Sequence, residues 1–425
     1  MSGMLARCQA SCARFSSRNR MSSWSRKDIA GRIHQTLPFR FRRTEYRFAL
    51  SQDLFSSHEI DPGSRLLLQE LQNSAIDTAG AVYDIGCGTG VLGIVAAREF
   101  NAERLVMEDR SALAAAFAEF NAEQNGLAAI AGSFCRAVGA GGLPSAVFDL
   151  VLSNVPAKAG QPVRTLLLQH ALASCTPGGL CAFVLVKALA TETEAELRRL
   201  DVAELRVFPH AGHTVFLASP GDRVNTALTR NAASTYHRGT PVLHTIESTS
   251  LRQQGIWGLG EFETPSFQTL MLAKMLRSFD ATAPLMFWNP GSGLLPSWVR
   301  KSFGGRPLTV GTDDALCIMA VHETLLQNRS RRTRVPVSAL LSSSIRALQS
   351  SVQEGSVIVL SIDASLSSGA RSELDRFCED LSGMSISMVV AGNSAEVSRI
   401  ERQRWASVHS RSRSRGLRGL VLRIR

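Results

Sequence analysis

The sequence predicts an α/β fold built from two tandem Rossmann-like domains, the second of them degenerate. Three observations predict it. Short apolar stretches alternate with helical stretches over residues 54–215, a glycine-rich stretch follows one of them at residues 84–90, and a similar order begins again near residue 259. Strands that alternate with helices form a parallel sheet with helices on both faces. A chain of 425 residues has room for two such domains.

The first domain is expected at residues 51–220, and its elements follow from periodicity and turn residues. A short apolar run that ends at glycines is typical of a buried parallel strand, and an alanine-rich run that ends at Asn125-Gly126 is typical of a helix. In chain order, the expected elements are a helix at 66–71, a strand at 81–85, a helix at 91–100, a strand at 105–107, a helix at 112–125, a strand at 148–153, a helix at 166–174 and a strand at 180–186.

The second domain is expected at residues 251–406, after a polar linker at 221–250. Leu54 and Gly86 are 32 positions apart, and so are Leu259 and Gly291. This alignment places Gly291 and Gly293 on the first two glycines of the earlier stretch, and residues 358–361 on the strand 150–153. We interpret the pattern as two copies of one module. The alternative is chance similarity between two α/β domains.

In that alignment the second copy lacks the residues expected to bind the cofactor and the methyl acceptor. Asn289 replaces an acid at the strand end, Leu295 replaces the third glycine, and residues 362–364 replace Asn154-Val155-Pro156. Asp313 or Asp314 remains as an acid for a ribose, and residues 327–336 form a basic loop. We therefore expect this copy not to catalyse.

The formal net charge of +11 is concentrated at the two ends of the chain. Residues 1–50 hold 11 Lys and Arg against Asp28 and Glu45, and residues 400–425 hold 8 Arg against Glu401. We expect a basic, partly disordered segment at 1–50 and a basic tail at 407–425. Such ends are suited to contact the phosphates of RNA. They can equally be disordered tails, and residues 1–27 are compatible with an organelle transit peptide or with a true start at Met21.

Several classes of protein are excluded by what the sequence lacks. No run of about 18 apolar residues is present, so no membrane span is expected. The eight cysteines form no CxxC pair and the nine histidines show no ligand spacing, so we expect neither a disulfide framework nor a metal site. This cysteine usage is typical of a reducing compartment, and the expected location is the cytoplasm. The oligomeric state is left open.

The stretch from Asp84 to Gly90 carries the strongest functional signal. Its glycines allow a tight turn and a close approach of the backbone to a ligand. The spacing G-x-G-x-G, with an acid two residues ahead, differs from the G-x-G-x-x-G of dinucleotide enzymes and suits a ligand with an ammonium group. Asp109 ends the next strand, where an acid can accept both hydroxyls of a ribose, with Glu108 as the alternative. The expected cofactor is S-adenosylmethionine, bound by Asp84, Gly86, Cys87, Gly88, Gly90, Asp109 and Asn154.

Three stretches resemble the class I S-adenosylmethionine-dependent methyltransferases, and more narrowly the methyltransferase small domain family, which includes ribosomal RNA guanine-N2 methyltransferases. The first runs from Leu54-Phe55-Ser56-Ser57 through Asp61-Pro62-Gly63-Ser64 to Leu68, the second is residues 84–90, and the third is Phe148 to Pro156. The resemblance implies transfer of a methyl group to a base nitrogen. The side-chain oxygen of Asn154 and the carbonyl of Val155, ahead of Pro156, would then hold the exocyclic amine.

Two departures keep other functions open. Val155 stands where the family has its first proline, and Ala157-Lys158 stand where an aromatic side chain would stack on a flipped base. A methyltransferase of proteins or small molecules is the first alternative, and a non-catalytic methyltransferase-like binding protein is the second. A nicotinamide oxidoreductase is a more distant one.

Overall fold

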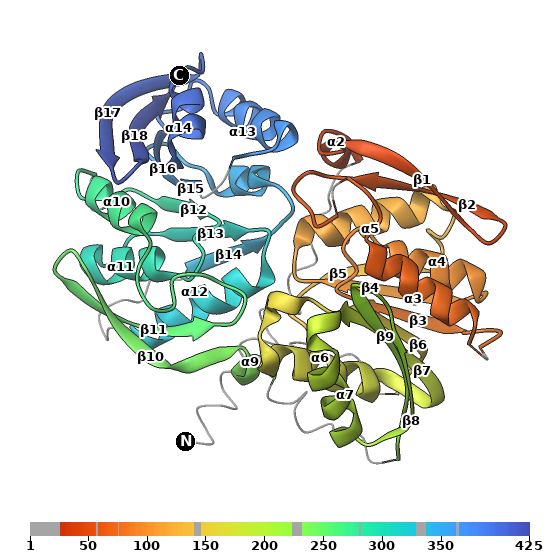
Figure 1. Ribbon diagram of the computed structural model, residues 1–425. Coiled ribbons are helices and arrows are strands. Elements are labelled where there is room, and N and C mark those ends of the chain that lie inside the picture. The colour runs from red at the N-terminus through yellow and green to blue at the C-terminus, as the bar shows by residue number, and fades with distance from the viewer. Residues whose placement is uncertain are drawn as a thin grey trace. The chain divides into compact units, whose positions relative to one another are not determined.

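The computed structural model describes residues 26–56, 58–74, 76–139, 146–222, 232–279, 282–328, 337–362 and 365–425. The chain divides after Tyr236 into two compact units (Figure 1). Each unit contains one seven-stranded sheet and one two-stranded hairpin. The arginines at positions 7–20, Ser57, Asp363, Ala364 and most of the basic loop at 327–336 lie outside the described residues.

The first unit has the strand order β5-β4-β3-β6-β7-β9-β8, in which β9 is antiparallel to both of its neighbours and the others are parallel. Helices α3, α4 and α5 cover one face together with the hairpin β1–β2, and α6 and α7 cover the other (Figure 1). The elements are α2 (Arg26–Ala30), β1 (Gln35–Phe41), β2 (Thr44–Leu50), α3 (Pro62–Gln72), β3 (Ala81–Ile85), α4 (Val91–Glu99), β4 (Arg104–Asp109), α5 (Ala112–Gln124), β5 (Ala131–Cys135), β6 (Phe148–Asn154), η1 (Ala157–Ala159), α6 (Gln161–Ser174), β7 (Cys175–Val186), η2 (Lys187–Leu189), α7 (Ala190–Arg199), β8 (Val202–Pro209), β9 (His213–Pro220) and α9 (Ala232–Thr235).

The second unit repeats this topology with the order β14-β13-β12-β15-β16-β18-β17. Helices α10, α11 and α12 pack on one face, and α13 and α14 on the other. The predicted fold of two tandem Rossmann-like domains is thus confirmed. The elements are β10 (His237–Ile246), β11 (Thr249–Ile256), α10 (Phe267–Leu276), β12 (Leu285–Trp288), α11 (Leu294–Phe303), β13 (Leu308–Thr312), α12 (Ala315–Gln327), β14 (Val337–Leu341), η3 (Ile345–Ser351), β15 (Val357–Ile362), α13 (Ser368–Asp380), β16 (Ser387–Asn393), α14 (Ser394–Glu401), β17 (Ala406–Ser414) and β18 (Leu417–Ile424).

Equivalent hydrogen bonds show that the two units are copies of one module. The Asn125 side chain, at the end of α5, accepts from the backbone N–H of Arg47 and donates to its carbonyl. Asn328, at the end of α12, makes the same pair of bonds with Arg252 in the second hairpin. In each unit this amide ties a helix end to the central part of a hairpin strand. Chance similarity between two α/β domains does not account for such a detail.

The predicted alignment of the two glycine stretches was wrong by two residues. Gly90 and Gly293 are the left-handed residues directly before α4 and α11, with φ of 85° and 80°. Gly88 therefore corresponds to Gly291, and Asn289, at φ 50°, takes the place of the first glycine. The third glycine is retained, and the residue lost is the first one. The alignment shifts because the N-cap of α10, Ser266, lies two residues closer to Gly293 than the N-cap of α3, Asp61, lies to Gly90.

Two further positions in the second unit are corrected by strand register. Asp84 lies beside Met107 on β4, and Phe287 lies beside Val310 on β13, so an apolar ring replaces the strand-end acid. On the fourth strand, Leu152 pairs with Asp84 and Val359 pairs with Phe287, so Asn154 corresponds to Ser361, one residue earlier than expected. These two replacements remove the carboxylate and the carboxamide that the first unit holds.

Within the described residues, the segments expected to be tails or linker are largely folded. Residues 35–50 form the hairpin β1–β2, residues 237–256 form β10–β11, and residues 406–424 form β17–β18. The high arginine content of these segments drew attention away from the apolar residues between the arginines. Phe48 and Tyr46 are buried in the first unit, and Leu420 and Leu422 in the second. For each of these segments, burial of the apolar side chains stabilises the folded state by more than the nearby positive charges destabilise it. Among the described residues, no helix is both long and apolar enough to cross a membrane.

Candidate active site

Three adjacent strands of the first unit bring the predicted site residues to one edge of its sheet. The glycine loop follows β3, Asp109 ends β4, and Asn154 ends β6, which lies on the other side of β3. Ligands of open α/β sheets bind beyond the carboxyl ends of the strands, where the chain order reverses. The site therefore lies where this fold offers one.

The loop between β3 and α4 presents its backbone to open space. Gly86, Gly88 and Gly90 have φ of 72°, 55° and 85°, a region that L side chains avoid. A Cβ atom added to Gly86 or Gly88 would meet no other atom within 4 Å, whereas one on Gly90 would lie 3.2 Å from the Cα of Ala118. The first two glycines thus leave room for a ligand, and the third lets α4 pack against α5.

The Asp84 carboxylate is fully buried beneath this loop. Its Oδ2 accepts a hydrogen bond of 2.8 Å from the backbone N–H of Gly93, and its Oδ1 has no partner among the described residues. Burial raises the pKa of Asp84 to about 7, and the nearby Asp109 adds to that effect. A buried acceptor without a donor is costly, so this oxygen favours a ligand that brings an N–H or a positive charge.

The Asp109 carboxylate braces the loop from the neighbouring strand. It accepts from the backbone N–H of Gly88 at 3.0 Å and from that of Ser111 at 2.9 Å. Glu108 points to the opposite face of the sheet, where it pairs with Arg136 and accepts from the Tyr83 hydroxyl at 2.9 Å. Of the two acids considered as acceptors for ribose hydroxyls, only Asp109 therefore lies on the side of the glycine loop.

The thiol of Cys87 is not suited to nucleophilic chemistry. Its side chain is buried, and burial together with Asp109 and Asp84 raises its pKa well above the ordinary value. A protonated thiol is a weak nucleophile. Cys87 contributes its backbone instead, since its N–H donates to the Glu108 carbonyl at 3.0 Å and holds the turn.

The Asn154 side chain is held by Asp61 and Ser64. Both residues belong to a stretch that resembles the family, but the sequence pattern assigned no role to them. Its Nδ2 donates to Asp61 Oδ2 at 2.7 Å and to Ser64 Oγ at 3.1 Å. Val155 is buried and its N–H donates to the Val184 carbonyl at 2.9 Å, while Pro156 is exposed at the start of η1. Although Val155 stands where the family has its first proline, the backbone at this position is held by a hydrogen bond to β7. Asn154 also remains partly exposed, as a contact with a substrate requires.

Asn121 is a second residue whose role emerged only from the structure. It is fully buried on α5, and its Nδ2 donates to the carbonyls of Thr89 and Ala49. A polar side chain inside an alanine-rich helix was the available signal. Such a side chain is buried only when its hydrogen bonds are satisfied.

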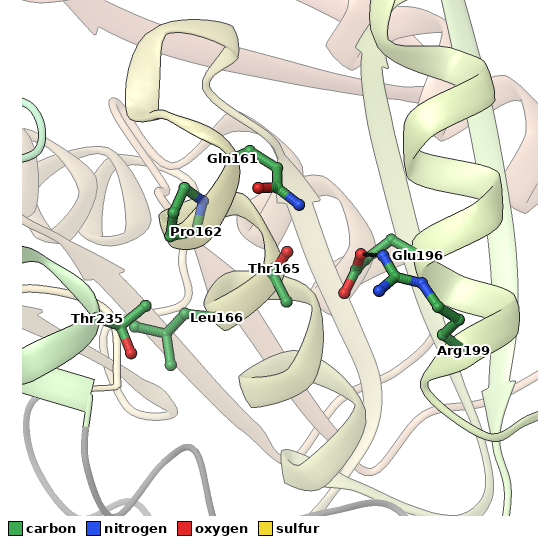
Figure 2. Close-up of a pocket in the computed structure, with 7 residues that line it drawn as sticks. All are labelled: Gln161, Pro162, Thr165, Leu166, Glu196, Arg199 and Thr235. Carbon is green, nitrogen blue, oxygen red and sulfur yellow. Dashed lines mark hydrogen bonds and ion pairs between the residues drawn. The ribbon is translucent and has the colours of Figure 1, made fainter. Parts of the chain in front are cut away.

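A cavity of about 260 Å³ lies elsewhere in the first unit, by helices α6, α7 and α9. Figure 2 shows that Glu196 and Arg199 on one wall contact each other, with Gln161 and Thr165 on α6 opposite them. None of the predicted site residues lines it. It is lined by Gln161, Pro162, Thr165, Leu166, Glu196, Arg199 and Thr235.

The second unit covers its own glycine loop with a carboxylate. Glu261 accepts from the Ser292 hydroxyl at 2.6 Å, from the Ser266 N–H at 2.8 Å and from the Thr269 hydroxyl at 2.5 Å. Asp314 is used as the N-cap of α12, where it accepts from the Leu316 N–H. The polar groups around this loop thus satisfy one another, in contrast to the unpaired oxygen of Asp84.

Comparison with known proteins gives consistent matches in the first unit. The model of the methyltransferase small domain family matches residues 45–204. The protein YbxB of Bacillus subtilis (strain 168), itself uncharacterised, is 31% identical over 141 residues, which are 33% of this chain and 68% of that protein. Ribosomal RNA small subunit methyltransferase C of Pseudomonas aeruginosa (strain UCBPP-PA14) is 36% identical over 130 residues, which are 30% of this chain and 37% of the relative.

A third relative and one solved structure extend the comparison. Ribosomal RNA large subunit methyltransferase G of Yersinia enterocolitica is 28% identical over 129 residues, 30% of this chain and 32% of the relative. The matches thus span about a third of the length of these two ribosomal RNA methyltransferases. The T. thermophilus 16S rRNA N2 G1207 methyltransferase, solved with AdoMet and guanosine, superposes with a TM-score of 0.65 at 13% identity, over 92% of this chain and 99% of that one. At that identity the superposition shows a shared fold of both units.

Proposed function

Since this chain belongs to the methyltransferase small domain family, we propose that its first unit transfers a methyl group from S-adenosylmethionine to a base nitrogen of ribosomal RNA. One observation carries the proposal. The Asn154 amide is held at the end of β6, beside a glycine loop that covers the unpaired oxygen of Asp84. This arrangement combines a site for a cationic cofactor with a hydrogen-bond acceptor for the amine that receives the methyl group.

The residues of the first unit fit S-adenosylmethionine. The cofactor supplies an electrophilic methyl group on a sulfonium, together with an ammonium, a carboxylate and a ribose. Asp84 Oδ1 would accept from the ammonium, directly or through water, and the open space at Gly86 and Gly88 would receive the amino-acid part. Asp109 would accept the ribose hydroxyls, with Gly90 and Cys87 shaping the loop. Asp84 and Asp109 also make the pocket acidic, which favours a cationic ligand.

The chain's contribution to methyl transfer is positioning. The side-chain oxygen of Asn154 and the carbonyl of Val155 would accept hydrogen bonds from an exocyclic amine, with Pro156 directing the chain away. These bonds aim the nitrogen lone pair at the methyl group and stabilise the positive charge that develops on the nitrogen. A covalent intermediate is not needed, in agreement with the protonated thiol of Cys87.

RNA is the partner that the exposed arginines favour. At the C-terminal end of the second unit, one acid, Glu401, faces a group of arginines on and before the hairpin β17–β18, and Arg411 and Arg418 pair with it. Arginine is the side chain best suited to phosphate recognition. The exposed members of this arginine surface are Arg402, Arg404, Arg411, Arg413, Arg415, Arg423 and Arg425.

A protein or small molecule as methyl acceptor is the second candidate. The observation that favours it is the stretch Ala157-Lys158, which is exposed and offers no aromatic ring for stacking. An exposed aromatic ring is nevertheless present elsewhere in the first unit. Phe55, on the segment that leads to Asp61, is 78% exposed. We propose that Phe55 supplies the stacking surface that the stretch after Pro156 lacks.

Methyl transfer to RNA can be tested directly. The full chain is incubated with tritiated S-adenosylmethionine and unmodified ribosomal RNA transcripts, and the RNA is digested to nucleosides. Label in a base-methylated nucleoside is expected, and Asn154→Ala should reduce it at least 100-fold. Label that enters protein or small molecules but not RNA would favour the second candidate.

A further inference from the structure

We propose that Asp61 and Ser64 are positioning residues, which hold the Asn154 side chain in the orientation that presents its oxygen to the methyl acceptor. The inference rests on the proposed function, because it concerns how Asn154 is prepared for that reaction. It assigns a role to the stretch Asp61-Pro62-Gly63-Ser64, which the cofactor and acceptor contacts leave without one.

The hydrogen bonds of Asn154 determine which end of its amide faces outward. An amide can rotate by half a turn, and this exchanges its NH2 group for its oxygen. Asp61 Oδ2, at 2.7 Å, is a carboxylate oxygen that only accepts, so the group facing it must be Nδ2. Ser64 Oγ takes the second N–H at 3.1 Å. Both donors of Asn154 are therefore used, and its Oδ1 is left to accept from a substrate.

The carboxylate itself is held firmly at the start of α3. Asp61 is the N-cap of this helix, and the same Oδ2 accepts from the Ser64 N–H at 2.9 Å. A Cβ atom on Gly63 would lie 2.9 Å from Asp61 Oδ2 and 3.0 Å from Cδ2 of His213. Such contacts are too short, so only glycine allows this close packing around the carboxylate.

The second unit separates the capping role of Asp61 from the positioning role. Ser266 occupies the equivalent N-cap of α10 and accepts from the Thr269 N–H at 3.1 Å. A serine thus suffices to cap this helix. In that unit the position of Asn154 is taken by Ser361, which has no amide to orient. The acid is present in the unit that has the amide and absent from the unit that lacks it.

The experiment compares Asp61→Ser, which keeps a capping hydroxyl, with Ser266→Ala as a control that weakens the equivalent cap in the other unit. In the full chain, Asp61→Ser should lower kcat roughly 10- to 100-fold, the effect of a misplaced reacting group. The dissociation constant for S-adenosylmethionine should change less than twofold. Ser266→Ala should leave kcat unchanged. In an Asn154→Ala background, Asp61→Ser should cause no further loss, because the group that it positions is absent.

A second readout does not depend on activity. In protein labelled with 15N-asparagine, the side-chain NH2 signals of Asn154, assigned from the Asn154→Ala spectrum, should show slow hydrogen exchange that Asp61→Ser abolishes. Exchange that stays slow in Asp61→Ser would overturn the proposed contact. Lost protection with unchanged kcat would overturn the positioning role. A wild-type chain that shows the protected amide but methylates no substrate would count against the proposed function instead.

Discussion

The Asn121 side chain connects the glycine loop after β3 to the hairpin of the first unit, with its Nδ2 only 2.9 Å from the carbonyl oxygen of Thr89. The same amide donates to the Ala49 carbonyl at 3.1 Å and accepts from the Ala49 N–H at 2.8 Å. In the second unit, Thr324 makes the corresponding bond to the Ser292 carbonyl at 3.1 Å. The glycine loop is therefore preorganised by a buried side chain on α5.

Replacement of Asn121 by alanine should destabilise the first unit and weaken cofactor binding. Three buried backbone groups lose their partners, and each unsatisfied group costs about 1–3 kcal/mol, so the expected loss of unfolding free energy is on the order of 3–9 kcal/mol. Denaturant unfolding and calorimetric titration with S-adenosylmethionine measure the two effects. Thr324→Ala is the control, which should destabilise the second unit alone. Equal affinity in wild type and Asn121→Ala would disprove the preorganising role.

The affinity for S-adenosylmethionine should rise with pH through about 7. Burial raises the pKa of Asp84 to about 7, so below that pH the carboxyl is protonated and attracts an ammonium poorly. The expected affinity increases by up to tenfold per pH unit below 7 and levels off above 8. Since a raised pKa favours the protonated folded form, the contribution of Asp84 to the stability of the unliganded protein decreases as pH rises through 7.

Substitution of Asp84 by asparagine tests this dependence. Binding should become weaker at pH 8 and nearly independent of pH. Asp149→Asn, which changes the carboxylate that accepts from the Ala81 N–H at the other end of β3, should retain the dependence. A slope that persists in Asp84→Asn would show that another group titrates.

Phe55 is expected to contribute to acceptor binding. Loss of a stacked ring costs about 1–3 kcal/mol per base, so Phe55→Ala should raise the KM for RNA roughly 5- to 150-fold with little change in cofactor affinity. Leu243→Ala removes an exposed apolar side chain from β10 in the second unit, away from the arginine surface in sequence, and should leave KM unchanged. A KM that is the same in Phe55→Ala and wild type would remove this residue from the acceptor site.

The arginine surface of the second unit should make RNA binding depend steeply on salt. If Arg411 and Arg413 each neutralise one phosphate, their joint replacement by glutamine should reduce the slope of log K against log salt by about 1.4–1.8. Arg198→Gln, at an exposed pair with Glu194 on α7, is the control. Filter binding at several salt concentrations gives the slopes. An unchanged slope would place the phosphate contacts elsewhere.

The sequence predicted the strands and the glycine turn after β3 because both depend on local pattern. Buried parallel strands such as β3 and β6 are short apolar runs, and glycines mark the turn that follows β3. The resemblance to the methyltransferase small domain family rested on the same stretches and is confirmed. The contact between Asp61 and Asn154 joins residues 93 positions apart, and no local pattern predicts such a distance.

Two predictions were wrong for physical reasons: the expectation of basic tails, which rested on a charge count, and the alignment of the two copies, which rested on a fixed spacing. Exposed arginines stand directly beside buried apolar residues in β1, β2 and β18, as Arg40 does beside Phe39, Arg47 beside Phe48 and Arg423 beside Leu422, so the composition resembled a tail. The repeat was misaligned because the second unit is two residues shorter between the N-cap of its first helix and its glycine loop. The left-handed φ angle of Gly293 directly before α11 and the strand register together establish the correct correspondence.

The central claim is that the first unit alone binds S-adenosylmethionine, and calorimetric titration of the full chain tests it most directly. Gly88→Arg should fill the open space of the loop, and Gly178→Arg is the matched control, because that glycine also has a left-handed φ and open surroundings. We predict one cofactor per chain for wild type and Gly178→Arg, and none for a folded Gly88→Arg. A folded wild-type chain that binds no S-adenosylmethionine would contradict the account.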